Sequence, residues 1–477
     1  MSRSPDAPAR PRRRSTWLAA PPPAPRLAPE EVRRRYPRLR LQVFLGIFVG
    51  YAGFYLIRNN VPLISALLID EGRVSTVGLG LISNAVLISY GLSKFVMAIV
   101  SDRSNARYFL PIGLALSALA NLALAFVPAL SATVAAFATV MFLNGWVQGM
   151  GWPPCGRTLV HWFSTSERGI KTAIWNVSHN VGGFGVGALA AAALHLTGND
   201  WTAAFWLPAL VALVVAVVSL VLLRDRPESE GLPPVEEYRD DPPKVSADEA
   251  AEAAAGVWHV VKTHVLLNRA MLLLALANVF VYALRYGILN WTPVYLSQER
   301  GASLGGGIAG FSVFELAGIA GTVLCGWLSD RVFRGNRSLT GIAFMLAVAV
   351  MTAVYWLKPT DAPLWMSLVT VATIGGLIYG PVMLIGLQAL DMSPRHVAGT
   401  AAGYTGLFGY VLGATLASTG IGLMIDRWGW DVTFGFLIGC CLATVALLVA
   451  VNRDEKRLLA RHAAATSGAD PEAPATR

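Results

Sequence analysis

An arginine lies in the middle of the first long apolar segment of the chain. The stretch YAGFYLIRNN, residues 51–60, follows LQVFLGIFVG and continues into VPLISALLI. Tyr51, Tyr55 and Arg58 are spaced i, i+4 and i+7, so a helix would hold them on one face. A charge at membrane depth costs about 2.5–3.5 kcal/mol on insertion scales, so such side chains usually face a protein or water-filled interior. The alternative is that Arg58 extends to the membrane interface.

A second arginine occupies the equivalent place in an internal repeat. Arg285, in YALRYGILNW, is related to Arg58 by the same offset that relates Tyr282 to Tyr55 (285 − 58 = 282 − 55). Three further pairs repeat at this offset to within one position: SDRSNAR with SDRVFRGNR, GWPP with IYGP, and the arginines of ERG and SPRHVAG. These landmarks predict two halves built on the same plan, as in transporters with parallel six-helix repeats. Arg58 and Arg285 would then face each other across a pseudo-two-fold axis.

Two facing arginines near the membrane midplane require an anion. A guanidinium stays charged at physiological pH, and its planar set of donors fits two phosphate oxygens at once. Without an anion the two like charges repel, so a loaded carrier would reorient more easily than an empty one. The alternative is a buried carboxylate partner. Glu315 is the obvious intramembrane candidate, but one carboxylate cannot fully compensate two arginines. The pair therefore predicts an anion site that suits phosphate.

The segment WNVSHN adds a histidine to a predicted membrane span. On a helix Asn176 and His179 are spaced i, i+3 and Trp175 and His179 are spaced i, i+4, so Asn176 and His179 could point into one cavity. A histidine suits phosphate recognition because its protonation responds to an approaching anion. The alternative is a hydrogen bond to a neighbouring helix. Further aromatic residues are candidates to line the pore, although such residues more often serve packing: Tyr90, Trp152, Tyr379 and Tyr410.

The composition predicts that these residues lie in a membrane. The chain has 477 residues, of which 55% are hydrophobic and 14% are charged; soluble domains have about 25% charged residues. Apolar runs of about 20 residues, the length of a membrane span, recur between residues 41 and 452. We count twelve, several of them broken by Gly or Pro, with the first near 41–68 and the fourth near 133–160. We therefore predict an all-α polytopic membrane protein with twelve transmembrane helices in two pseudo-two-fold-related six-helix halves.

The spans divide the chain into five predicted segments. These are a basic tail at 1–40, a first half at 41–223, a linker at 224–269, a second half at 270–452 and a tail at 453–477. Much of the net charge of +9 lies in the Arg-rich N-terminal tail, which predicts a cytoplasmic location for that tail. The linker ends in AEAAAGVWHVVKTHVLL, which predicts an amphipathic helix. The four cysteines show no metal or disulfide spacing, and we expect no metal and no cofactor.

The two SDR motifs suggest a structural role rather than substrate binding. Short basic loops that hold an Asp-Arg pair would lie on the cytoplasmic side and would latch neighbouring helices through charge-assisted hydrogen bonds. Lys94, at the end of a span, is expected to extend to the interface. The predicted gating or structural residues of the two loops are Asp102, Arg103, Asp330 and Arg331.

The motifs together resemble a known family. The duplicated SDR loops in a twelve-span chain look like the major facilitator superfamily. GWVQGMGWPPCGRTLVHWFSTSERG, WNVSHN, LRYGILNWTPVYL, GWLSDRVFRGNR and AGTAAGYTGLFGY resemble the organophosphate:phosphate antiporter family, most closely its glycerol-3-phosphate transporter branch, over residues 26–453. The resemblance implies a major facilitator fold in the inner (cytoplasmic) membrane with both termini cytoplasmic. It also implies exchange of external organophosphate for internal phosphate by alternating access.

The same resemblance implies roles for individual residues. It makes Arg58 and Arg285 the phosphate-binding arginines and His179 the binding histidine. Supporting positions fall on Tyr51, Tyr55, Tyr90, Trp152, Trp175, Asn176, Tyr282, Glu315, Tyr379 and Tyr410.

Two positions depart from the pattern of that branch. The branch typically has Lys directly after the first arginine, where this chain has Asn59, and Asp five residues after the second, where it has Asn290. The two differences leave the formal charge of the site unchanged, as if a Lys–Asp pair had been removed as a unit. If that pair helps to rearrange the site, a hydrogen bond between Asn59 and Asn290 could replace it in a gating or structural role. The departures leave hexose phosphate and phosphoglycerate open as substrates.

The sequence thus supports one class of function over two others. The first is a transporter, expected to be monomeric, that binds a phosphate ester and inorganic phosphate. The second is a transporter-like sensor that binds an organophosphate and signals to a membrane partner, although no obvious signalling domain is present. The third, a membrane phosphatase or kinase, is disfavoured because no P-loop, metal cluster or nucleophile–base pair appears. We expect no enzymatic activity and no nucleic-acid partner.

Overall fold

The computed structural model describes residues 18–19, 21–101, 104–241, 262–359, 361–392 and 398–466. Among these residues, ten helices are long and apolar enough to cross a membrane. The last of the ten runs over Gly403–Asp454, 52 residues, and is interrupted at Gly429, whose φ is 76°. Since one crossing takes about 20 residues, this segment contains two crossings. The shorter helices α6 and α7 supply one more, and the twelve predicted spans are accounted for.

The elements fall into two consecutive groups. The first group is α1 (Pro29–Leu56), α2 (Asn60–Leu63), α3 (Ser65–Asp70), α4 (Thr76–Ser101), α5 (Ala106–Phe126), α6 (Val134–Gln148), α7 (Trp152–Trp162), α8 (Thr165–Asn176), α9 (Ser178–Thr197), α10 (Ala203–Leu222) and α11 (Val235–Arg239). The second group is α14 (Arg269–Arg300), α15 (Leu304–Arg331), α16 (Arg337–Leu357), α17 (Leu364–Asp391), α18 (Ala398–Phe408), the π-helical turns η4 (Gly409–Gly413) and η5 (Leu416–Gly420), and α19 (Ile421–Thr466).

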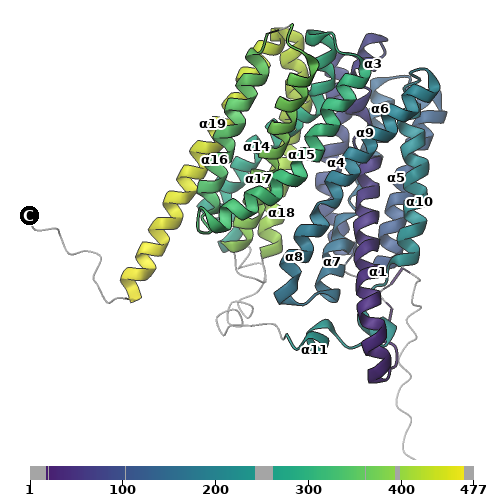
Figure 1. Ribbon diagram of the computed structural model, residues 1–477, viewed down its shortest axis with the longest axis vertical. Helices are drawn as coiled ribbons and strands as arrows, with labels where there is room; N and C mark the ends of the chain where they lie inside the picture. Colours follow the sequence, from purple (N-terminus) through teal and green to yellow (C-terminus); the bar gives the residue numbers. More distant parts are fainter. Residues whose placement is uncertain are drawn as a thin grey trace, which may run out of the picture.

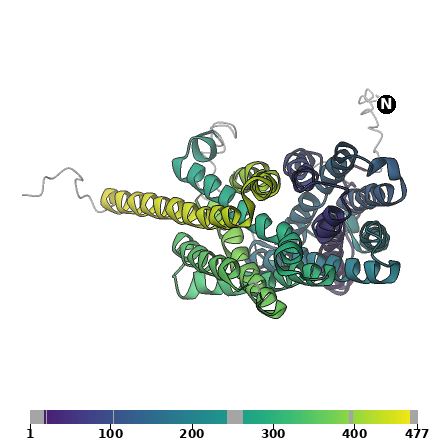
Figure 2. The ribbon, with the colours of Figure 1, turned by 90° about the horizontal axis from the view of Figure 1, so that it is seen from above.

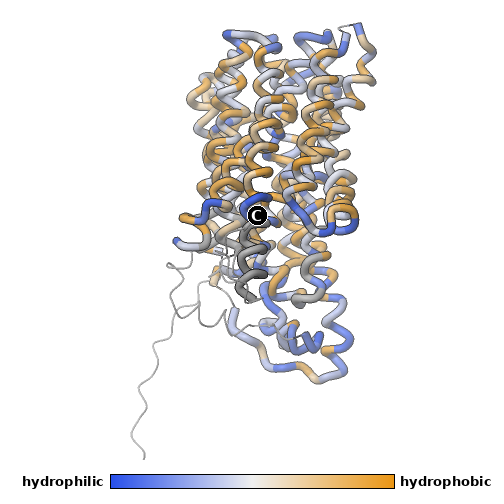
Figure 3. The backbone as a smooth tube through the Cα atoms, turned by 90° about the vertical axis from the view of Figure 1, so that its left-hand side faces the viewer, coloured by the Kyte–Doolittle hydropathy of each residue, from blue (hydrophilic) through white to orange (hydrophobic). Residues whose placement is uncertain are grey.

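The two groups lie side by side in the bundle (Figures 1 and 2). Apolar residues form a band around the middle of the bundle, and polar residues collect at its two ends (Figure 3). Large apolar side chains on the outside of this band are exposed, among them Leu119, Val214 and Val350. Such a surface is expected where helices face lipid rather than water. The boundaries 41–223 and 270–452 for two independent halves stay a prediction.

The two groups contact each other mainly toward the end of the bundle that holds α3. α4 contacts η5 and α19, and α9 contacts α15. A Cβ atom on Gly80 would lie 2.7 Å from the carbonyl oxygen of Ser418, and one on Gly422 would lie 2.9 Å from the carbonyl oxygen of Thr76. These glycines therefore allow the backbone of α4 to approach those of η5 and α19 closely, as small residues do between membrane helices.

The first predicted span, near 41–68, is broken inside the bundle, and the sequence predicted that several spans are broken by Gly or Pro. α1 ends at Leu56 and α2 begins at Asn60. Pro62 is the reason, because a proline lacks the N–H that would bond to the carbonyl four residues earlier, and its ring collides with that carbonyl. The residue four positions before Pro62 is Arg58. The arginine consequently lies in an open turn inside the bundle.

Two other predicted spans are interrupted as well. The span predicted near 133–160 is divided between α6 and α7, and WNVSHN is divided between α8, which ends at Asn176, and α9, which begins at Ser178. The predicted loop residues Asp330 and Arg331 form the last turn of α15. Asp102, Arg103 and most of the amphipathic helix predicted at the end of the linker lie outside the described residues.

Candidate functional site

Arg58 and Arg285 are both buried, each with 3% of its surface exposed. Arg58 occupies the turn between α1 and α2, whereas Arg285 lies within the continuous helix α14. The guanidinium carbon of Arg58 lies 4.3 Å from the ring centroid of Tyr55 and 4.0 Å from that of Tyr90. The guanidinium carbon of Arg285 lies 4.5 Å from the ring centroid of Tyr379. Each cation is thus held against aromatic faces at distances that permit cation–π attraction.

One chain of ring contacts joins the two arginines through the histidine. The ring centroid of His179 lies 5.5 Å from that of Tyr55 and 5.5 Å from that of Tyr379. Tyr55 contacts Arg58 and Tyr379 contacts Arg285. Residues of α1, α9, α14 and α17 therefore meet along this side of the site.

A second chain of ring contacts, through other tyrosines, also connects Arg58 with Arg285. Tyr410 of η4 lies with its ring centroid 5.0 Å from that of Tyr90 and 5.0 Å from that of Tyr282. Tyr90 packs against Arg58, and the Tyr282 centroid lies 5.9 Å from the guanidinium carbon of Arg285. The two chains of contacts together form a closed circle of side chains, which we call the aromatic circle of the site. The structure thus brings together predicted residues from both groups of helices.

Among the described residues, only the Nε of the Arg58 guanidinium has a hydrogen-bond partner. Its Nε donates a hydrogen bond to Oε1 of Gln148 at 2.6 Å. Its Nη1 and Nη2 are buried, and neither has a hydrogen-bond partner among the residues that the structure describes. A buried charged donor without a partner is costly. The arrangement therefore favours an anion opposite Nη1 and Nη2.

Arg285 is held through a tyrosine and a carboxylate. Its Nη2 donates to the hydroxyl of Tyr379 at 2.8 Å, and this hydroxyl donates to Oε2 of Glu315 at 2.7 Å. Nδ2 of Asn180 in α9 donates to the same carboxylate oxygen at 3.1 Å, which links the two groups of helices. The Nε of Arg285 has no partner among the described residues. Glu315 thus compensates Arg285 in part and leaves donors for a ligand.

His179 is oriented by the break between α8 and α9. Its Nδ1 donates to the carbonyl oxygen of Asn176, so this proton is committed to the backbone. Nε2 is the ring nitrogen left to meet a ligand. Asn176 and His179 lie on either side of a short turn at Val177, whose φ of −60° and ψ of −22° are still helical, so the two residues stay on one membrane-spanning segment, Ile170–Thr197.

Tyr51, Trp152 and Trp175 lie at the edge of the aromatic circle. The ring centroid of Tyr51 lies 5.6 Å from that of Tyr55 and 4.8 Å from that of Trp175. Trp152 lies with its ring centroid 6.5 Å from that of Trp175, and the ammonium of Lys94 lies 4.6 Å from the Trp152 centroid. Lys94 is therefore directed toward these aromatic residues, where the sequence suggested an interfacial side chain.

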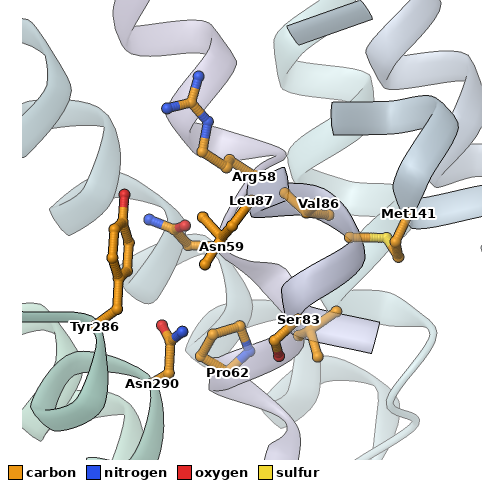
Figure 4. A pocket seen from close by; sticks show the side chains of 10 residues that line it. Arg58, Asn59, Pro62, Ser83, Val86, Leu87, Met141, Tyr286 and Asn290 are labelled. Carbon is orange, nitrogen blue, oxygen red and sulfur yellow. The ribbon is translucent and has the colours of Figure 1, made fainter. Parts of the chain in front are cut away.

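Asn59 and Asn290 line one small cavity beside Arg58. It has a volume of about 20 Å³ and is also lined by Ser83 and Tyr286. In Figure 4 the side chain of Asn290 lies below that of Asn59, and the guanidinium of Arg58 points away from both. Such a cavity has room for about one water molecule. The two asparagines thus lie beside the predicted anion site and are not part of the aromatic circle.

The second SDR motif contributes to an ion-pair cluster at one end of the bundle. Nη1 of Arg337 pairs with Oδ1 of Asp330, and Nε of Arg337 lies 3.4 Å from Oδ2 of Asp391. Nη1 of Arg337 also donates to the hydroxyl of Ser329 at 2.8 Å. The cluster connects α15, α16 and α17, while the Arg331 side chain is exposed.

Three residues near the arginines escaped the sequence analysis. Tyr286 follows Arg285 directly, and the other two are polar residues within apolar segments, which is the signal that could have identified them. The three are Gln148, Asn180 and Tyr286.

Comparison with known proteins identifies the family. Residues 43–418 match the model of the Major Facilitator Superfamily. The chain is 45% identical to the glycerol-3-phosphate transporter of Bacillus subtilis (strain 168), over 91% of this chain and 98% of that protein. It is 37% identical to the membrane sensor protein UhpC of Escherichia coli (strain K12), over 92% of this chain and 99% of that protein.

A solved structure agrees on the fold. The crystal structure of a bacterial homologue of the human lysosomal transporter Spinster, inward-facing and unoccupied, has a TM-score of 0.61 at 16% identity and covers 87% of this chain and 93% of that one. The fold prediction is confirmed. The chain belongs to the Major Facilitator Superfamily and, within it, to the organophosphate:phosphate antiporter family that its motifs resemble.

Proposed function

We propose that this protein is an antiporter that takes up an organophosphate, most simply glycerol-3-phosphate, in exchange for inorganic phosphate. The observation that supports the proposal is the pair of buried arginines, Arg58 and Arg285, which have unpaired donors and belong to one aromatic circle. The relative with 45% identity, named a glycerol-3-phosphate transporter, supports the choice of substrate. A hexose phosphate or a phosphoglycerate is the alternative.

The electrostatics of the site explain why exchange would be favoured over release. An empty site leaves Nη1 and Nη2 of Arg58 buried without partners among the described residues, and a phosphate of about −2 charge removes that penalty. Phosphate or its ester would therefore stabilise the closed intermediate through which the carrier passes. The empty carrier would cross less readily, which couples uptake of one anion to export of the other.

The proposal includes an orientation of the protein in the membrane. We place both termini in the cytoplasm and the α3 end of the bundle outside the inner membrane. The contacts of α4 with η5 and of α9 with α15 would then close the outer side. Alternating access would open these contacts and close the opposite side, with the arginines at the pivot. One chain contains the proposed site, so we expect a monomer to suffice.

A sensor function is the second candidate, because a membrane sensor protein shares 37% identity with this chain. A sensor would bind the phosphate ester with the same arginines but would show little flux. Counterflow in proteoliposomes separates the two possibilities, because only a transporter exchanges internal labelled phosphate for external ligand. Binding without counterflow would favour the sensor.

The test of the proposal is the replacement of each arginine by lysine. A lysine keeps the charge but loses the two parallel donors. We expect Arg58→Lys and Arg285→Lys each to lower phosphate counterflow by about 100-fold, in keeping with about 2–5 kcal/mol for a buried charged hydrogen-bond partner. Arg300→Lys is the matched control, since Arg300 lies in the same helix as Arg285 and donates to the Pro359 carbonyl instead. Near-normal exchange by both variants would refute the two-arginine site.

A panel of external phosphate esters against internal labelled phosphate then identifies the substrate. The proposal predicts fastest counterflow with glycerol-3-phosphate. Faster exchange with a hexose phosphate would keep the antiport and correct the substrate.

A further inference from the structure

A group of buried amide and hydroxyl side chains supports the open turn that contains Arg58. The group consists of Ser117 and Asn121 of α5 and Asn144 and Gln148 of α6, and we call it the amide network. Ser117, Asn144 and Gln148 are fully buried, and Asn121 is 1% exposed. Ser117 donates to Oδ1 of Asn144 and accepts from Nε2 of Gln148 at 3.0 Å.

The amide network binds the carbonyl that the helix break releases. The carbonyl oxygen of Ile57 accepts from Asn121 at 3.2 Å, from Asn144 at 3.1 Å and from Gln148 at 3.4 Å. Gln148 also donates to the carbonyl oxygen of Phe54 at 3.2 Å. A buried carbonyl outside a helix needs such partners. The broken segment is therefore anchored to α5 and α6.

Gln148 is the member of the amide network that has a hydrogen bond with the arginine. Its Oε1 accepts from Nε of Arg58 at 2.6 Å while its Nε2 is committed to the network. This bond uses the Nε donor and fixes the plane of the guanidinium. The two terminal nitrogens, Nη1 and Nη2, are thus the pair of donors that Arg58 presents to an anion.

The repeat shows that this arrangement belongs to one arginine only. Applying the offset between Arg58 and Arg285 to the network positions leads to apolar residues and a glycine in the second group of helices: Phe344, Val348, Val371 and Gly375. The helix α14 continues without a break past Arg285. Arg285 is held instead by the hydroxyl of Tyr379. The two arginines are therefore positioned by different means.

We propose that Gln148 is a positioning residue that sets the terminal donors of Arg58 for bidentate binding of a phosphate group. The inference rests on the proposed function in that Arg58 binds the phosphate. Gln148 holds one face of the site rigid, and Arg285 adjusts to the ligand on the other face through the Tyr379 hydroxyl. Arg58 would thus bind the phosphate group, which the candidate substrates share.

The experiment compares three variants in proteoliposomes with inorganic phosphate as the probe. Gln148→Met keeps the volume but removes the acceptor. We expect it to raise the KM for phosphate about tenfold with the maximal rate within about threefold, which is the signature of lost binding. Gln148→Glu keeps an acceptor but places a competing negative charge on Arg58, and we expect a still larger rise of KM.

Asn121→Leu is the control for damage to the amide network, because the Asn121 amide donates to the carbonyl oxygens of Ile57 and Ser117, whereas Arg58 donates to Gln148. We expect it to lower the thermal midpoint of the purified protein and to leave the KM within about twofold. A normal KM in both Gln148 variants, with a lowered midpoint as in Asn121→Leu, would overturn the inference. If Arg58→Lys loses exchange while the Gln148 variants keep their KM, the inference alone is wrong. If Arg58→Lys itself exchanges normally, the proposed function is wrong.

Discussion

The hydroxyl of Tyr379 stands between Arg285 and Glu315: it accepts from Arg285 Nη2 at 2.8 Å and donates to Glu315 Oε2 at 2.7 Å. The same carboxylate oxygen accepts from Asn180 across the contact between α9 and α15. A ligand that draws Arg285 away from Tyr379 would therefore disturb a bond that joins the two groups of helices. This connection offers a physical route from anion binding to the opening of that contact.

The carboxylate should weaken phosphate binding in the resting site. Arg58 and Arg285 give two positive charges and Glu315 one negative charge, so Glu315→Gln raises the charge of the pocket by one. We expect the KM for phosphate to fall by about threefold and the maximal exchange rate to fall as well, because the anion then leaves more slowly. Initial rates of counterflow measure both quantities. Glu299→Gln, on an exposed residue of α14, is the control, and an unchanged or raised KM in Glu315→Gln would contradict the expectation.

The two asparagines that line the small cavity should behave as a pair. Asn59→Lys or Asn290→Asp alone places an unpaired charge in a buried position, for which we expect at least about tenfold slower exchange. The double variant creates an ion pair across the cavity and should recover activity, with a coupling energy of about 1–3 kcal/mol in a double-mutant cycle. Asn59→Gln, which adds no charge, is the control. Strictly additive losses would mean that the two side chains do not face each other.

A buried ion pair at the end of the bundle should govern stability rather than transport. Nη2 of Arg157 donates to both carboxylate oxygens of Asp225 at 2.7 Å, and the two side chains are 8% and 1% exposed. Asp225→Asn removes the negative charge that accepts two hydrogen bonds from Arg157 in a buried position, so we expect a loss of about 3–5 kcal/mol of unfolding free energy. Denaturation of the purified protein in detergent measures it.

The matched control is an exposed pair, Arg26 and Glu237, whose side chains are 65% and 52% exposed. Glu237→Gln should cost no more than about 1 kcal/mol, since solvent screens such pairs. Equal losses in Asp225→Asn and Glu237→Gln would show that burial does not set the strength of these bonds.

The close approach of α4 and η5 should control which side of the carrier is closed. A side chain at Gly80 would collide with the backbone of Ser418, at 2.7 Å from its carbonyl oxygen. Gly80→Val is expected to hold the α3 end open and to slow exchange by about tenfold. A cysteine introduced at Ser83 should then react faster with an impermeant maleimide added outside. Gly435→Val is the control, because a Cβ at Gly435 meets nothing within 4 Å; equal labelling rates would refute the expectation.

Much of this protein could be predicted from local patterns. Apolar runs of membrane length predicted the helical bundle, because the absence of water in lipid forces backbone groups to pair within helices. The internal repeat related Arg285 to Arg58 without knowledge of any contact, since duplicated halves preserve spacing. The residue types Arg, His and Tyr were sufficient to suggest an anion, because their chemistry does not depend on the fold.

The contacts of the arginines could not be predicted in this way. Pro62 breaks the first span at Arg58, but nothing near Pro62 in the sequence reveals that Gln148 of α6 reaches the guanidinium. Equally, Tyr379 and Glu315 are distant in the sequence and meet only because α15 and α17 pack together. Which donors of Arg58 and Arg285 remain for a ligand depends on those partners. The sequence therefore supplied the charges, and the packing of helices distant in the chain selected the nitrogens that can bind an anion.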